Sequence, residues 1–289
     1  MKSTFIAVVF GVTTAALIGG FAAAIAFGGP KPPPPIFSIE DPLKSVDFSG
    51  MSPLLHFHAG DDASLAYRYY RPDGESSKGS EVLVHGSSAS SNSMHVLAKA
   101  FAKAGYAAFA LDMRGHGASG TKGKISYFGQ LENDIDAFSR SLALPKSSTL
   151  IGFSARDGLA LRFAGRARQG EFESYLLLSP FMSQKTPNYS PDSGGWVNVG
   201  FPRVFAISLL NFIGIQRFND MPVTDFALTE ATKYHLTPEY SLAHATNFRP
   251  MRDHAANIQA VHQPCSVLAG IDDEAFLHRH TEIHIPQSG

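Results

Sequence analysis

The sequence predicts an α/β fold with a mainly parallel, doubly wound sheet, preceded by a separate apolar helix at the N-terminus. From Leu54 onward, short apolar or β-branched runs alternate with segments of helical periodicity, which is typical of parallel sheets with helices on both faces. The 289 residues are 44% hydrophobic and 17% charged, a composition typical of a folded core. A long uncharged stretch followed by four consecutive prolines sets the N-terminus apart.

Residues 1–28 are predicted to be a transmembrane anchor or a signal peptide. Residues 5–27 carry no charge and form a helix of about 35 Å at ~1.5 Å per residue, which can cross a bilayer core of about 30 Å. This length favours a retained anchor, whereas the Ala-Ile-Ala sequence at residues 24–26 is typical of a cleavage site. Both alternatives predict a membrane-anchored or exported protein whose folded domain lies on the extracytoplasmic side.

A proline-rich linker is predicted between this helix and the folded part. The four prolines at residues 32–35 form a stiff polyproline II spacer, so we assign residues 29–53 to the linker. The core is assigned to residues 54–180 and 251–289. Within it, strands are predicted at residues 82–84, 107–111, 149–151, 175–178 and 266–269. Helices are predicted around residues 96–104, 131–142 and 159–167.

Residues 181–250 are predicted to form an inserted helical cap over the ends of the strands. The alternation of strands and helices stops there, and one strongly apolar helical segment, residues 202–213, begins with a proline and is followed by Gly214. Its apolar positions leave only a polar stripe of Arg203, Ser208 and Asn211, so we expect this helix to be covered on most sides. The alternative is an ordinary peripheral helix of the core.

Charge and cysteine content exclude several kinds of partner and cofactor. The 24 basic and 25 acidic residues give a net charge of −1 without a long basic run, so nucleic-acid binding is not expected. Cys265 is the only cysteine, which excludes an intramolecular disulfide and a cysteine-based zinc or iron–sulfur site within this chain. We expect no cofactor and no metal.

The loop after residues 149–151 contains a candidate nucleophile, Ser154. Functional sites of parallel sheets form outside the carboxyl ends of strands, and Ser154 lies between a predicted strand and a predicted helix. A serine on such a sharp turn presents its hydroxyl, while the helix N-terminus stabilises developing negative charge. The pattern Gly-x-Ser-x-Gly is incomplete because Arg156 occupies its fifth position, and a helix N-cap is the alternative role of Ser154.

Two further strand-end loops carry candidate site residues. After residues 82–84, Gly86 lets the backbone approach closely, so the N–H groups of Ser87 and Ala155 are the candidate donors to an oxyanion. The neighbouring His85 is expected to shape the turn. After residues 266–269, either carboxylate of the pair Asp272–Asp273 could orient a histidine, although each could equally cap a helix.

Together with these loops, residues 111–120 (Leu-Asp-Met-Arg-Gly-His-Gly-Ala-Ser-Gly) resemble the α/β-hydrolase family. The resemblance is to its serine-hydrolase branch, which includes monoacylglycerol-lipase-like and serine-aminopeptidase-like enzymes, and covers about residues 54–276. It implies the α/β-hydrolase fold and a structural role for Asp112 and His116. It also implies Ser154 as nucleophile, Asp273 as triad acid, and Ser87 and Ala155 as oxyanion donors.

The function implied by this resemblance is hydrolysis of an ester or similar acyl bond in a hydrophobic small molecule. The triad of this fold runs Ser, Asp, His, and only 16 residues follow Asp273. They are too few for a further helix of about 10 residues and a strand of about 5 before the histidine. The expected position is therefore missing from this sequence, although His284 is a remaining candidate, and His278 and His280 fall in a predicted helix.

Activity of this chain is therefore in question, and two other functions are weighed against it. The first is a non-catalytic protein, a pseudo-hydrolase that binds lipids or small apolar ligands. The second, haloalkane or epoxide chemistry, is disfavoured because those relatives have a carboxylate where this sequence has Ser154.

Overall fold

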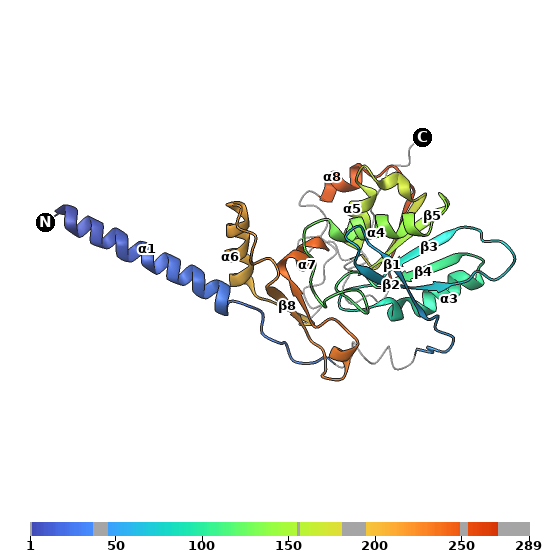
Figure 1. Ribbon diagram of the computed structural model, residues 1–289, viewed down its shortest axis with the longest axis horizontal. Coiled ribbons are helices and arrows are strands. Elements are labelled where there is room, and N and C mark those ends of the chain that lie inside the picture. The colour runs from blue at the N-terminus through green and yellow to red at the C-terminus, as the bar shows by residue number, and fades with distance from the viewer. Residues whose placement is uncertain (1, 37–45, 155–156, 181–194, 249–253, 271–289) are drawn as a thin grey trace.

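The computed structural model describes residues 2–36, 46–154, 157–180, 195–248 and 254–270. Its central element is a seven-stranded sheet. The strands are β1 (Leu54–His58), β2 (Ser64–Tyr70), β3 (Ser80–Val84), β4 (Ala107–Leu111), β5 (Ser148–Phe153), β6 (Ser174–Leu178) and β10 (Cys265–Leu268). They are arranged in the order β1-β2-β4-β3-β5-β6-β10, in which the five strands from β4 to β10 are parallel and β1 and β2 form an antiparallel edge (Figure 1).

Helices cover both faces of this sheet. The longer ones are α3 (His95–Lys103), α4 (Gln130–Ser141), α5 (Asp157–Ala164) and α8 (His254–Gln259). Short 3-10 helices occur at η2 (Ser91–Met94), η4 (Gln169–Glu171) and η5 (Thr232–Tyr234). On β3, Val82 and Val84 pack in the cluster that contains α4 and α5, whereas Leu83 packs with α3. This alternation follows from the two-residue period of a strand and confirms the doubly wound arrangement.

The five strands and three helices predicted for the core are confirmed, with ends that differ by up to three residues. Gly105 follows α3 with a φ of 94°, as expected for a glycine that ends a helix. The antiparallel strands β1 and β2 were not predicted. Their sequences interrupt apolar residues with histidine and arginine, and so lack the short apolar runs of the other strands.

The segment from 195 to 248, which we call the cap, combines helices and strands. It contains β7 (Val197–Val199), α6 (Phe201–Phe212), β8 (Pro222–Phe226), β9 (Glu239–Ser241) and α7 (Leu242–Asn247). The strands form an antiparallel sheet in the order β7-β8-β9. Because two of these strands are only three residues long, their alternation is too short to be recognised in the sequence, which predicts helices alone.

The expectation that residues 202–213 are covered on most sides is wrong. In α6, Phe201, Phe205 and Phe212 are exposed, while Arg203 is buried. Arg203 turns inward because carbonyl oxygens accept hydrogen bonds from its guanidinium there. Of the predicted polar stripe, Arg203 therefore lies on the inner side of this helix, whereas Ser208 is exposed.

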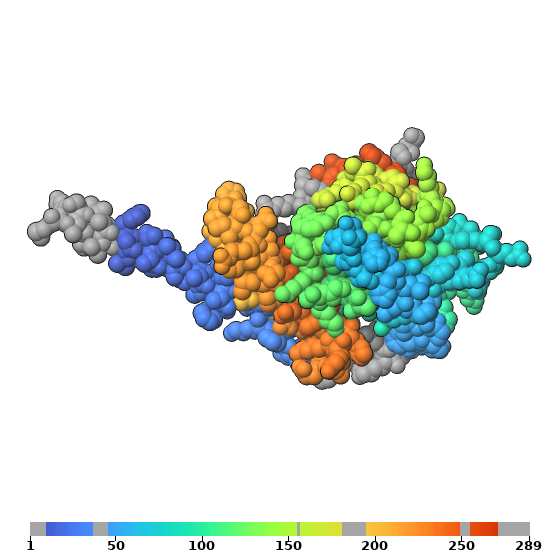
Figure 2. All heavy atoms as spheres, in the orientation of Figure 1, coloured from blue at the N-terminus to red at the C-terminus, as the bar shows by residue number. Residues whose placement is uncertain are grey.

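The N-terminal helix α1 (Lys2–Phe27) projects away from the rest of the molecule (Figures 1 and 2). Its apolar stretch Phe10–Phe27 is long enough to span a membrane, and none of it is buried in the protein. By length and composition it suits either a membrane anchor or a signal sequence. Its C-terminal end contacts α6, so the cap lies between α1 and the seven-stranded sheet (Figure 1).

Candidate active site

Backbone strain is concentrated at the carboxyl ends of three neighbouring strands. Ser88, Ser154 and Ser179 follow β3, β5 and β6, and each has a positive φ, of 62°, 59° and 52°. Because these strands are parallel and adjacent, the three serines lie at the same edge of the sheet. A left-handed conformation costs a non-glycine residue roughly 1–2 kcal/mol, and such strain clusters at functional sites. This edge is therefore the candidate active site.

Ser154 occupies the turn between β5 and α5. Its positive φ places it outside the regular helix, as a nucleophile at a strand-to-helix corner requires. The turn after β3 lies directly against it, because a Cβ added at Gly86 would be 3.4 Å from the Cβ of Ser154 and 3.1 Å from the ring of Phe153. The structure therefore brings together the two loops that carry the predicted nucleophile and the predicted donor Ser87.

Close packing of β5 on α5 fixes this corner. A Cβ added at Gly152 would be 2.6 Å from the Oδ1 atom of Asp157 and 3.1 Å from the Cβ of Ala160. The first distance is too short for a Cβ atom and the second is unusually tight, so a larger residue at this position would push the strand and the helix apart. Gly152 thus determines where Ser154 leaves the strand.

Asp157 is a buried residue of this corner, and the sequence does not predict its burial. Its carboxyl group is completely buried and accepts hydrogen bonds from the amides of Ser154 and of Leu178, the latter at 3.2 Å. Burial raises the pKa of Asp157 well above its usual range, against the effect of these hydrogen bonds. The sequence does indicate a contact between Ser154 and Asp157, because a serine followed three residues later by an acidic residue has the spacing of a helix capping box.

The turn after β3 is held by His85. This buried imidazole accepts the N–H of Met113 at its Nε2 atom (3.2 Å), while its Nδ1 atom donates to the carbonyl oxygen of Gly86 (2.8 Å). Both ring nitrogens are thus used in hydrogen bonds to the backbone. His85 shapes the turn, as the sequence predicts.

The cap fastens the same turn through three hydrogen bonds, which we call the Ser88 latch. The N–H of Ser88 donates to Oη of Tyr240 (2.5 Å), and its hydroxyl donates to the carbonyl oxygen of Thr237 (2.7 Å). The N–H of Thr237 in turn donates to the carbonyl oxygen of Ser88 (2.8 Å). The latch thus fixes the backbone one residue beyond Ser87. Sequence reasoning missed Tyr240 because it lies 152 positions away in the chain.

The motif at residues 111–120 has structural contacts. The two oxygens of Asp112 accept the amides of Ser91 (2.7 Å) and Ala118 (2.8 Å), which ties three segments of the core together. The Nε2 atom of His116 is 2.8 Å from Oη of Tyr240, so this imidazole supports the Ser88 latch. Neither side chain is left for a role in the triad.

Of the four predicted site residues, the structure describes Ser154 and Ser87. Ala155, Asp273 and the neighbouring Asp272 lie outside the described residues, as do the candidate bases His278, His280 and His284. Over the described part of the chain, no group of three or more His, Cys, Asp or Glu side chains could hold a metal ion.

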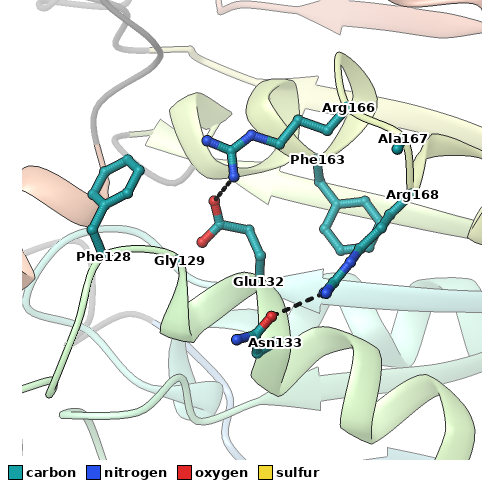
Figure 3. A pocket seen from close by; sticks show the side chains of 8 residues that line it. All are labelled: Phe128, Gly129, Glu132, Asn133, Phe163, Arg166, Ala167 and Arg168. Atoms are coloured by element: carbon teal, nitrogen blue, oxygen red, sulfur yellow. Dashed lines mark hydrogen bonds and ion pairs between the residues drawn. The ribbon is translucent and has the colours of Figure 1, made fainter.

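Two surface cavities, of about 420 and 480 Å³, lie away from the candidate site and are lined by neither Ser87 nor Ser154. The smaller one lies between α4 and the end of α5 (Figure 3). Its arginines already have partners, since Arg166 pairs with Glu132 at 3.6 Å and Arg168 donates to Asn133 at 3.0 Å (Figure 3). Arg168 also forms an ion pair with Asp136, so carboxylates within the protein compensate both arginines.

The sequence and the fold of this chain resemble those of known proteins. The family model described as "Serine aminopeptidase, S33" matches residues 75–282. The structure is similar to a soluble variant of monoglyceride lipase from Saccharomyces cerevisiae in complex with a substrate analog, with a TM-score of 0.59, 18% identity, and coverage of 80% of this chain and 81% of that chain. No curated protein sequence matches significantly.

Two further solved structures share the fold. For a monoacylglycerol lipase from Paleococcus ferrophilus the TM-score is 0.52 and the identity 19%, with 71% of this chain and 77% of that chain covered. For a membrane phospholipase A described as a bacterial virulence factor, the TM-score is 0.51 and the identity 16%, with 93% of this chain and 82% of that chain covered. At these identities the likeness establishes the α/β-hydrolase fold.

Proposed function

Because the chain belongs to the serine aminopeptidase S33 family, within the α/β hydrolases, we propose that it is a serine hydrolase for an ester or similar acyl bond of a hydrophobic small molecule. The observation that carries this proposal is the position of Ser154 on a strained corner against the Gly86 turn. Strain is retained at a site where it holds a reacting group in place.

The proposed reaction follows from the groups around this corner. The hydroxyl of Ser154 attacks the acyl carbonyl, and the N–H groups of Ser87 and Ala155 donate to the oxyanion that forms. A histidine takes the hydroxyl proton and returns it to the leaving group, while Asp273 orients that histidine. Water then hydrolyses the acyl-enzyme. The histidine is not assigned to a described residue.

The aromatic residues of the cap favour a substrate with an apolar acyl chain. Trp196 packs on Phe226, and Phe226 packs on Tyr240 of the Ser88 latch, so aromatic side chains lead from the cap to the candidate site. The two similar lipases act on monoglycerides by their names, which supports an ester substrate over a peptide. Hydrolysis of p-nitrophenyl esters of increasing chain length, compared with aminoacyl nitroanilides, separates these classes.

Membrane attachment through a retained α1 is the second part of the proposal, with the folded domain on the extracytoplasmic side. Arg203 of the cap donates to the carbonyl oxygens of Ile25 and Ala26, and cleavage after Ala26 would detach this end of α1 from the cap. The contact therefore favours an anchor over a cleaved signal. N-terminal mass analysis of the membrane-extracted protein tests it.

A non-catalytic lipid- or small-ligand-binding protein is the second candidate. Asp157 favours it, because a buried carboxyl group packs against Gly152 in this corner, three residues after the candidate nucleophile. This candidate predicts that an apolar ligand raises the Tm of the wild-type protein and of Ser154→Ala equally.

A fluorophosphonate probe distinguishes the two candidates. A hydrolase reacts at Ser154, so labelling is expected in the wild-type chain and absent in Ser154→Ala. The matched control is Ser179→Ala, which removes another serine with positive φ at the same sheet edge and should leave labelling intact. Folded wild-type protein that takes up no label would contradict the hydrolase.

A further inference from the structure

The cap helix α6 carries an apolar face that no described part of the protein covers. Phe201, Phe205, Leu209 and Phe212 are spaced by four, four and three residues and so share one side of the helix. Their exposed fractions are 65%, 71%, 46% and 86%. Figure 2 shows α6 as a ridge on the surface of the body near α1. A patch of this kind marks a binding surface.

The opposite side of α6 is fixed to the end of α1 by Arg203. Its Nε atom donates to the carbonyl oxygen of Ile25 (2.8 Å), one terminal nitrogen donates to that of Ala26 (2.9 Å), and its backbone N–H donates to that of Gly28 (3.2 Å). The last carbonyl groups of a helix lack partners within the helix and carry partial negative charge. Arg203 therefore satisfies the C-terminal end of α1 with a positive charge from α6.

Two glycines allow this joint to close. A Cβ added at Gly29 would be 2.3 Å from a terminal nitrogen of Arg203, and one added at Gly200 would be 2.6 Å from the carbonyl carbon of Gly29. Side chains at either position would push the two segments apart. The joint between α1 and α6 is thus a close contact that depends on residues of both segments.

We infer that α6 is an interfacial helix, which lies in the surface of the bilayer that α1 spans, with Phe205 and Phe212 at the boundary between headgroups and acyl chains. The inference rests on the proposed anchoring by α1. It follows because α6 runs transverse to α1 at its end (Figure 1), where a spanning helix leaves the bilayer. Aromatic side chains favour this level of a membrane.

The chemistry of the exposed face selects a neutral bilayer as partner. The only charged residue of α6 is Arg203, and it is buried on the inner side, so the outer face offers apolar contacts without basic groups for anionic lipids. Since the cap lies between α1 and the sheet, this placement brings the cap next to the lipid phase (Figure 1).

The test places a fluorescent probe at single cysteines in the full chain. In a Cys265→Ser background, Phe212→Cys is labelled with an environment-sensitive fluorophore and the protein is reconstituted into phosphatidylcholine vesicles that carry doxyl-labelled lipid. Leu17→Cys in α1 is the control for membrane depth, and Val96→Cys on the exposed side of α3 is the control for a site in water. Phe205→Cys repeats the measurement should Phe212→Cys fail to fold.

The inference predicts that a doxyl group near the headgroup quenches the Phe212 probe at least about threefold more than the Val96 probe, as expected for a shallow helix. Leu17 should respond best to a doxyl group near the bilayer centre. Quenching at Leu17 without quenching at Phe212 overturns the inference and leaves the anchor intact, whereas quenching at neither site also overturns the proposed anchoring. A Phe212 probe that is shielded only at high protein concentration, without lipid quenching, indicates a second copy on this face and also overturns it.

Discussion

Arg162 in the core and Arg203 in the cap are both buried, but their charges are compensated in different ways. Arg162 of α5 pairs with Glu132 of α4 at 2.7 Å, with both side chains almost inaccessible to water. Arg203 donates instead to backbone carbonyl oxygens, of α1 and of Pro222. The charge of Arg162 is thus compensated by one carboxylate, whereas that of Arg203 is compensated by carbonyl groups at the end of another helix. The ion pair of Arg162 therefore lies within the core, whereas Arg203 couples the cap to α1.

The largest effect is expected from Glu132→Gln. This change leaves the guanidinium of Arg162 charged and buried without its counterion, and breaking a buried pair in this way costs about 3–5 kcal/mol. The free energy of unfolding, measured by urea denaturation at neutral pH, should fall by that amount. The exposed pair of Glu230 and Lys233 offers the control, since Glu230→Gln should change stability by less than about 1 kcal/mol. Equal effects of the two changes would contradict the role assigned to Arg162.

Arg203→Leu should have a smaller and more local effect. It removes the hydrogen bonds from the guanidinium to the carbonyl oxygens of Ile25 and Ala26, which are partly accessible to water, so the expected cost is about 1–2 kcal/mol. Because these groups belong to the joint with α1, amide hydrogen exchange should increase around residues 24–30 and in α6. Exchange in β3 and β5 should stay the same. Faster exchange throughout the core would contradict the distinction between the two arginines.

The same contrast explains how far the sequence predicts this structure. The core strands and the position of Ser154 follow from short apolar runs and a strand-end serine, because these are local patterns. The exposed face of α6 does not follow, because periodicity shows that a helix is apolar but not which side faces the protein. Arg203 looks like a solvent-facing residue in the sequence, since its carbonyl partners are 177 and 178 positions away. The sequence does not predict the contact of Tyr240 with Ser88, because the two residues are 152 positions apart. It does not predict the burial of Asp157 either, because that burial depends on how α5 packs on the sheet.

Tyr240→Phe tests whether the cap acts on the core through the Ser88 latch. The change keeps the ring but removes the acceptor of the Ser88 N–H, which is expected to cost about 1 kcal/mol. Because this amide is next to that of Ser87, the rate of fluorophosphonate labelling at Ser154 should fall about tenfold, for about 1.4 kcal/mol lost in the transition state. Tyr234→Phe, at an exposed cap residue, is the control and should change neither quantity. A lower Tm with an unchanged labelling rate would show that the latch only stabilises the cap.

The smallest effect concerns the pH dependence of stability through Asp157. Its pKa in the folded protein is raised by burial, so its contribution to stability is complete below the unfolded pKa of about 3.9 and is lost as the pH rises through the folded pKa. Asp157→Asn can still accept the amides of Ser154 and Leu178 but cannot ionise. Its Tm at pH 8 should therefore exceed that of the wild type by about 2–4 °C, the shift given by about 1 kcal/mol in a domain of this size, and the margin should shrink toward pH 4. The neighbouring Cys265 does not produce this trend, because burial raises the pKa of its thiol to about 11. A margin that is constant from pH 4 to pH 8 would instead indicate an effect of packing, without titration of Asp157.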